Sequence, residues 1–173
     1  MNSKAAYILF FAVVAVLQIF LLNNLSVSVY VAPVIYAVCI IMMPLETPQI
    51  VMLVIGAALG ALMDVTMGTN GLNVAVALPV AVLRRPILYA LADLSNLAKI
   101  EGVPSAERLG DFRFHRYVVT MMVMHTLLFF GFEWLSVHNF GFFLARWLCS
   151  TAVSIAIAYP LIYIFTPKLS RKL

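Results

Sequence analysis

Four ionisable side chains interrupt or border long apolar runs of this sequence: Asp64, His125, Glu133 and Arg146. A charged group at membrane depth is costly, so each such residue needs a polar partner and is a candidate functional residue. Glu133 and Arg146 stand on either side of a short polar connection at residues 138–139, and an antiparallel helical hairpin would place them at similar depth. We predict an ion pair that acts as a structural clamp, with a functional site as the alternative and Asp64 as a second acceptor if its helix adjoins.

His125 lies in the middle of an apolar run and has no charged neighbour one helical turn away. A proton relay through a histidine needs a chain of polar partners, which these neighbours do not provide. We expect instead an interior histidine that is hydrogen-bonded to Ser154 or to a backbone carbonyl. The methionine and phenylalanine side chains around it are expected to be packing groups.

Signatures of several common catalytic sites are absent from the sequence, which contains no HExxH, no GxSxG and no Gly-Lys-Ser/Thr loop. An aspartyl dyad needs two carboxylates at one place, whereas Asp93 is predicted on the opposite side of the membrane from Asp64. Cys39 and Cys149 form no CxxC motif, and both lie in apolar runs, which favours a packing role. We therefore expect no enzyme, no cofactor and no metal site.

The composition excludes a water-soluble globule and indicates a single integral membrane domain over residues 1–173. Hydrophobic residues make up 64% of the chain and charged residues 10%, against roughly 45–50% and about 25% in soluble proteins. Too few polar side chains remain to cover a compact body in water. The net charge of +4 is therefore interpreted as an orientation signal, and not as a sign of nucleic-acid binding.

Hydropathy predicts an all-α bundle of six transmembrane helices, since each span needs about 20 mainly apolar residues. The six predicted spans cover residues 5–22, 25–43, 50–63, 72–83, 117–135 and 140–165. The first is expected to be a retained anchor, because no small-x-small cleavage site follows it. The third and fourth are short, so they either extend past Asp64 and Pro86 as tilted helices or form a re-entrant hairpin.

The positions of the basic residues predict that both termini are cytoplasmic. With the N-terminus inside, ten of the eleven Lys and Arg residues fall on the cytoplasmic side, and only Arg146 departs from this pattern. The one long loop, at about 84–116, begins with an amphipathic pattern and continues with charges of both signs. We interpret it as a cytoplasmic, interfacial arm that holds the fifth span, with a partner-docking site as the alternative.

A small-residue motif in the third predicted span indicates close helix packing. Gly56 and Gly60 form a GxxxG motif, and Ala57 and Ala61 form a second pair with the same spacing. Small residues at this spacing let two helix backbones approach closely in a membrane. The facing helix belongs either to this chain, which we favour, or to a partner.

A succession of short motifs runs through residues 17–84: Leu17-Gln18, Pro33-Val34-Ile35-Tyr36, Met43-Pro44, Gly56, Gly60-Ala61-Leu62-Met63-Asp64 and Gly68-Thr69-Asn70-Gly71-Leu72. Their order and spacing resemble the rod shape-determining protein MreD family. The length, the six predicted spans and the basic C-terminal tail agree with that resemblance. Residues 93–173 match the family mainly in hydropathy.

The resemblance implies a non-enzymatic, multi-pass scaffold of the bacterial inner membrane that serves cell-wall elongation. Its implied partner is the single-pass protein MreC and, indirectly, the actin-like MreB filament, a glycosyltransferase and a transpeptidase, together with membrane lipid. Gly56 and Gly60 become candidate docking residues. The candidate periplasmic contact is the turn that contains Asp64, Gly68, Asn70 and Gly71.

The same resemblance implies a fold similar to the S-components of energy-coupling-factor transporters, which keeps a second function open. A small-molecule transporter or ligand-binding subunit would need polar groups that converge on a cavity. The predicted spans contain few such groups, and they are scattered: Gln18, Asn73, His125, Ser150, Thr151 and Ser154.

Overall fold

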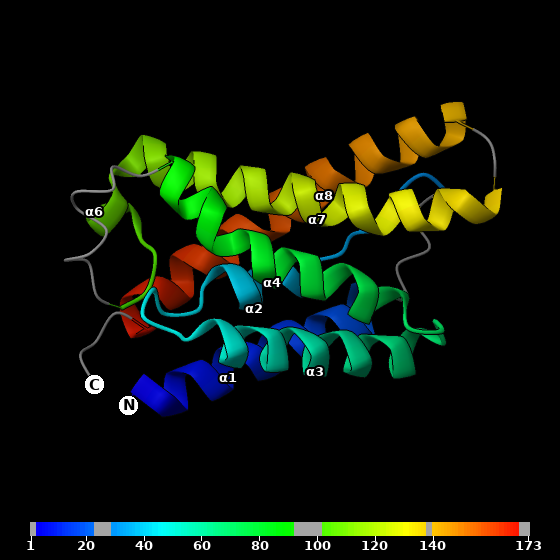
Figure 1. The fold of residues 1–173 in the computed structure, drawn as a ribbon. Helices are drawn as coiled ribbons and strands as arrows, with labels where there is room; N and C mark the ends of the chain where they lie inside the picture. Colours follow the sequence, from blue (N-terminus) through cyan, green and yellow to red (C-terminus); the bar gives the residue numbers. More distant parts are fainter. Residues whose placement is uncertain (1–2, 23–28, 92–101, 138–139, 170–173) are drawn as a thin grey trace.

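The computed structural model describes residues 3–22, 29–91, 102–137 and 140–169, and its regular elements are helices that lie side by side in a bundle (Figure 1). In chain order they are α1 (Ser3–Val16), its π-helical continuation η1 (Leu17–Leu22), α2 (Ala37–Ile41), α3 (Gln49–Met67), α4 (Leu72–Leu91), α6 (Ala106–Leu109), α7 (Asp111–Val137) and α8 (Phe140–Leu169).

Four of these helices, α3, α4, α7 and α8, are long and apolar enough to cross a membrane. This is the pattern of a multi-pass membrane protein. The apolar helix at Ala5–Phe20 is shorter. The helices predicted at residues 117–135 and 140–165 are observed within α7 and α8. Each sequence is a continuous apolar run without an early proline, which favours an unbroken helix.

The second predicted span, residues 25–43, is not one helix in its described part. Residues 29–36 are irregular, and only Ala37–Ile41 form a helix. Pro33 accounts for the break, because proline lacks a backbone N–H and disfavours helical geometry in the preceding residue. Figure 1 nevertheless shows this segment running back along the bundle, from the end at which η1 finishes toward the start of α3.

The short third and fourth predicted spans are parts of longer helices, as the first alternative predicts, and both helices are long and apolar enough to cross a membrane. α3 continues through Asp64, and α4 continues past Pro86. Gly68 ends α3 in the left-handed conformation with φ of 66°, and Gly71 has φ of 86° just before α4. Glycine adopts positive φ at little cost, which suits both positions of this tight turn.

The predicted cytoplasmic arm is shorter than expected. Its amphipathic beginning is the last part of α4, and its end, from Asp111, belongs to α7. Between these helices the structure describes the segment at residues 102–110, which includes α6. The prediction that residues near Lys99 lie at the membrane interface falls outside the described residues.

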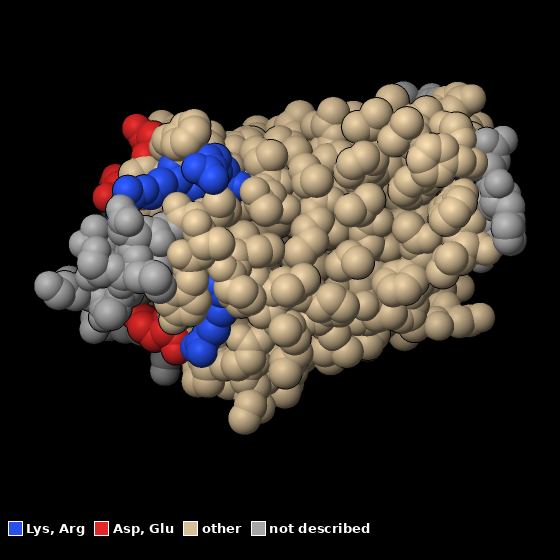
Figure 2. Space-filling view, turned by 45° about the horizontal axis from the view of Figure 1, so that its top comes forward, with Lys and Arg blue, Asp and Glu red and all other residues tan. Residues whose placement is uncertain are grey.

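The short helix α2 is the centre of the bundle. All five of its residues are buried, and it packs against α1, α3, α4 and α7. The start of α1 and the end of α8 lie at the same end of the molecule (Figure 1). Figure 2 shows that the described Lys, Arg, Asp and Glu residues of the visible face gather at this end, while the other described residues of that face are uncharged.

Candidate functional site

The two glycines of the GxxxG motif face α4 of the same chain. A Cβ atom added to Gly60 would lie 2.6 Å from Cα of Val74, and one added to Gly56 would lie 3.3 Å from Cβ of Ala81. The glycines therefore permit backbone contact inside the α3–α4 hairpin. The favoured alternative, a facing helix within the chain, is the arrangement observed.

The two alanines of the second motif lie elsewhere on α3. Ala57 is half-buried and Ala61 is exposed. Each residue turns a helix by about 100°, so these alanines lie about 100–140° round the helix from Gly56. The structure thus separates the four predicted packing residues into an internal pair of glycines and an outward pair of alanines.

Asp64 caps the first turn of α4 across the intervening turn. Its Oδ1 accepts hydrogen bonds from the backbone N–H of Asn73 at 2.9 Å and from the hydroxyl of Thr69 at 2.5 Å, and its Oδ2 accepts from the N–H of Val74 at 3.1 Å. A carboxylate at a helix N-terminus satisfies free N–H groups and matches the helix dipole. Asp64 was expected to accept from Arg146 only if their helices adjoin; α3 packs chiefly against α4, and the ion pair observed for Arg146 is with Glu133.

The rest of the α3–α4 turn is open. Gly68, Asn70 and Gly71 are exposed, and a Cβ added to either glycine would meet no atom within 4 Å. The predicted contact turn therefore combines a buried carboxylate, which fixes its shape, with an accessible surface. This surface lies at the opposite end of the bundle from the start of α1 (Figure 1).

Glu133 and Arg146 form the predicted ion pair between α7 and α8. Nη1 of Arg146 lies 3.0 Å from Oε1 of Glu133, and the two side chains are 25% and 32% exposed. The guanidinium also lies over the rings of Phe130 and Phe142, with its carbon 5.7 and 5.8 Å from their centroids. Cation–π contacts and a carboxylate together lower the cost of this arginine near the membrane edge.

The backbone N–H groups of the irregular segment before α2 donate to side chains of the surrounding helices. The N–H of Ala32 donates to Oγ of Ser150 at 3.0 Å, and the N–H of Val34 donates to Oγ of Ser154 at 2.9 Å. A non-helical backbone inside a membrane protein must find such partners within the protein. Both serines come from α8, so they position a segment that lies far away in sequence.

Gln18 completes this arrangement from η1. Its Oε1 accepts from the N–H of Ile35 at 2.7 Å, and its Nε2 donates to the carbonyl of Pro33 at 3.2 Å. The sequence identifies Gln18, Ser150 and Ser154 as polar residues within predicted spans, but it does not show that they bind the backbone of the irregular segment. The available signal was a proline in the second apolar run together with amide and hydroxyl side chains in the first and sixth.

His125 does not make the predicted bond. Both of its ring nitrogens are buried and have no hydrogen-bond partner among the described residues. The hydroxyl oxygen of Ser154 instead accepts a hydrogen bond from the backbone N–H of Val34. The imidazole lies edge-to-face with the ring of Tyr36, at 4.8 Å between centroids, so its observed contact is aromatic.

Arg84, which was predicted to lie in a cytoplasmic loop, is a buried residue of α4. Its Nε donates to the Tyr117 hydroxyl at 3.1 Å, and its Nη2 donates to the Met43 carbonyl. The Tyr117 hydroxyl in turn donates to the carbonyl of Ile41 at 2.9 Å. Arg84 and Tyr117 thus bind backbone carbonyls at the C-terminal end of α2, where a cation is electrostatically favoured.

The described residues hold no group of three or more His, Cys, Asp or Glu side chains arranged to bind a metal. Comparison of the chain with protein-family models, with curated proteins and with solved structures finds no significant match. The arrangement of its own residues is therefore the basis for a functional proposal. Two accessible features bear on that proposal: the outer face of α3, with Ala57 and Ala61, and the exposed α3–α4 turn.

Proposed function

We propose that the protein is a non-enzymatic scaffold of the MreD type in the bacterial inner membrane, where it binds an MreC-like single-pass partner. Through that partner it helps to organise the MreB filament, a glycosyltransferase and a transpeptidase during lateral cell-wall synthesis. The observation that carries the proposal is that the small residues of α3 lie on two different sides of the helix. Its glycines hold the hairpin together, while its alanines face outward.

The outer face of α3 is suited to a second helix. Ala57 and Ala61 are one turn apart, and the exposed side chains of Val54 and Val65 lie on the same side of the helix. Apolar side chains alone give little specificity in lipid, whereas small residues allow close backbone contact with one partner. Because α3 is fixed against α4, this face is presented on a rigid support.

We further propose that the chain crosses the membrane six times, with both termini cytoplasmic and a bundle similar to that of S-components. The second crossing is the broken segment that leads into α2. Two observations support this topology: α1 starts and α8 finishes at the same end of the molecule, and charged residues gather there. Positively charged residues accumulate on the cytoplasmic side of membrane proteins.

The test compares two pairs of outward alanines in co-purification with an MreC-like partner. The double substitution Ala57→Leu with Ala61→Leu is expected to lower partner recovery at least fivefold while the melting temperature in detergent stays unchanged. The matched control changes Ala152 and Ala156, an exposed pair with the same spacing on α8. If the α8 variant alone loses the partner, the assignment to α3 is overturned.

A transporter or ligand-binding subunit of the S-component type is the second candidate. Its predicted polar residues are indeed buried, but five of the six are hydrogen-bonded within the chain. The hydroxyls of Thr126 and Thr151 bond to one another at 2.7 Å, and the side-chain Nδ2 of Asn73 donates to Asp64 at 3.1 Å. These bonds favour the scaffold, because bonded groups are committed to the fold; the exceptions among the six residues are Oδ1 of Asn73 and the ring nitrogens of His125, which are buried without a partner in the described part of the chain.

A further inference from the structure

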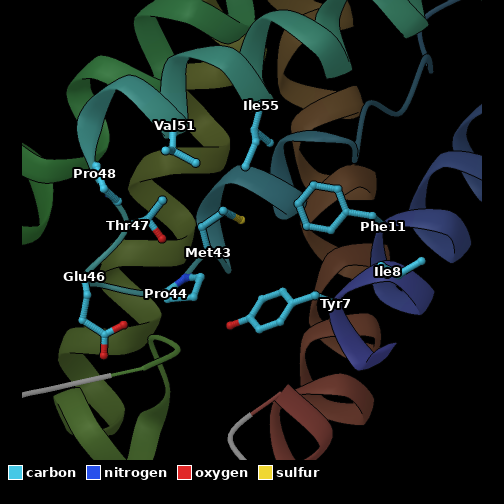
Figure 3. A pocket seen from close by; sticks show the side chains of 10 residues that line it. All are labelled: Tyr7, Ile8, Phe11, Met43, Pro44, Glu46, Thr47, Pro48, Val51 and Ile55. Atoms are coloured by element: carbon cyan, nitrogen blue, oxygen red, sulfur yellow. The ribbon is translucent and has the colours of Figure 1, made fainter. Parts of the chain in front are cut away.

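A groove of about 670 Å³ opens between α1 and α3. Figure 3 shows side chains of α1 on one flank and of α3 on the other, with Met43 and Pro44 from the turn after α2 between them. Most of the lining is apolar, and Glu46 and Thr47 stand at one end. This volume falls in the range of about 300–1,000 Å³ that is typical of sites for small ligands.

The groove is too short along α1 and α3 to enclose more than about one turn of a transmembrane helix. Its lining extends from Tyr7 to Phe11 on α1 and from Val51 to Ile55 on α3. Each flank is therefore about one helical turn, or roughly 6 Å, long. A partner helix is about 10 Å wide and needs contacts over many turns, whereas a single hydrocarbon chain is narrow and flexible enough to enter.

The polar end of the groove contains a hydrogen-bond donor without a partner. The hydroxyl oxygen of Tyr7 is buried and bonds to no group among the described residues. The neighbouring polar groups are already engaged: Oε1 of Glu46 accepts from the N–H of Gly102 at 2.6 Å, and the carbonyl of Thr47 accepts from Arg85 at 2.8 Å. A buried unpaired hydroxyl is costly, so it favours a bound acceptor.

Two arginines bind the backbone of this end, where the Glu46 carboxylate offsets part of their positive charge. Arg84 donates to the carbonyl of Met43 and Arg85 to the carbonyl of Thr47, and both Met43 and Thr47 line the groove. Nη1 of Arg84 is buried without a partner in the described part of the chain. The groove is lined by the first part of α1 and the turn before α3, at the end of the bundle where α1 starts (Figure 1), and charged residues gather at that end, a position that suits lipid headgroups.

We propose that this groove binds one acyl chain of an anionic glycerophospholipid, with an ester or phosphate oxygen of the lipid accepting a hydrogen bond from Tyr7. The acyl chain of the lipid lies between Phe11 and Ile55, and the lipid headgroup lies toward the end of the groove near Arg84 and Arg85. This inference is independent of the proposed scaffold function. Val51 and Ile55 lie about 100–140° from Gly56 in the opposite sense to Ala57 and Ala61, so lipid and partner use different sides of α3.

The experiment measures lipid retention by native mass spectrometry of the full chain in mild detergent, with palmitoyl-oleoyl phosphatidylglycerol or phosphatidylcholine added. The wild type is expected to retain one phosphatidylglycerol and to bind phosphatidylcholine more weakly. Tyr7→Phe removes one hydrogen bond and is expected to weaken retention about threefold to tenfold. Val51→Trp narrows the groove and is expected to abolish retention of the bound lipid.

Val54→Trp is the matched control, because Val54 is exposed on α3 outside the groove. It is expected to retain lipid as the wild type does, and melting temperatures establish that every variant is folded. Equal retention by the Val51 and Val54 variants would overturn the site. Unchanged retention in Tyr7→Phe would overturn the role of the hydroxyl, and equal retention of both lipids would overturn the preference for an anionic headgroup.

Discussion

Arg146 and Glu133 join α8 to α7 through a contact of 3.0 Å between Nη1 and Oε1. The pair lies close to the connection between the two helices, at the end of the bundle away from the other charges in Figure 2. Since both side chains are partly exposed, the pair is expected to contribute modestly to stability. The pair is expected mainly to fix the register of α8 relative to α7, because it joins one position on each helix.

The first prediction concerns this ion pair. Glu133→Gln and Arg146→Gln are each expected to destabilise the protein, and the double variant is expected to lose less than the sum, with a coupling of about 0.5–1 kcal/mol. Thermal unfolding in detergent measures the cycle. Glu107→Gln, which removes a carboxylate from α6, is the control, and its effect on stability should add to that of Arg146→Gln. If the effects of Glu133→Gln and Arg146→Gln also add, the ion pair is not coupled.

The second prediction concerns the cap on α4. Asp64→Ala removes the acceptor of the Asn73 and Val74 N–H groups and is expected to lower the free energy of unfolding by about 1–2 kcal/mol. Asp64→Asn retains one acceptor oxygen and should cost less. Asn70→Ala, in the exposed part of the same turn, is the control for folding in detergent. A larger loss at Asn70 than at Asp64 would contradict the capping role.

The third prediction concerns close packing in the α3–α4 hairpin. Gly60→Ala places a methyl group 2.6 Å from the backbone of Val74, so the two helices must separate, at a cost of about 1–3 kcal/mol. Gly56→Ala meets the Ala81 side chain at 3.3 Å and should cost less.

Gly131→Ala is the control for this third prediction, because an added Cβ there meets no atom within 4 Å. It should be neutral or stabilising, by up to about 1 kcal/mol, since alanine has the higher helix propensity. Melting temperatures of the three variants decide the order. If Gly60→Ala is as stable as Gly131→Ala, backbone contact at Gly60 is not required.

The fourth prediction concerns the irregular segment. Ser154→Ala leaves the buried N–H of Val34 without its partner, which is expected to cost about 1–3 kcal/mol. Thr166→Ala is a suitable control, because the Thr166 hydroxyl donates to the carbonyl of Ile162 in its own helix at 2.6 Å and its loss strands no N–H group. Urea unfolding of both variants in the same detergent makes the comparison; equal stabilities would mean that Val34 finds another acceptor.

Features that depend on local sequence could be predicted. Continuous apolar runs define α7 and α8, and the symmetry of an antiparallel hairpin is enough to pair Glu133 with Arg146. The GxxxG spacing likewise indicates close contact at Gly56 and Gly60. In each case the relevant residues lie within one helix or in two consecutive helices.

Features that depend on distant contacts could not be predicted. Hydropathy records that residues 25–43 are apolar, but it does not record that serines of α8 satisfy their backbone. Counting basic residues by loop assumes that each one is exposed, whereas Arg84 is buried and donates to the carbonyl of Met43, which follows the short helix α2. His125 illustrates the same limit, because the Ser154 hydroxyl expected to bond to it accepts instead from the backbone of that irregular segment.

The dependence of residues 29–36 on α8 also constrains biogenesis. The N–H groups of Ala32 and Val34 bond to serines that are 118 and 120 positions later in the chain. These partners do not exist until most of the polypeptide has left the ribosome. Residues 29–36 therefore acquire these two hydrogen bonds only after α8 has been synthesised.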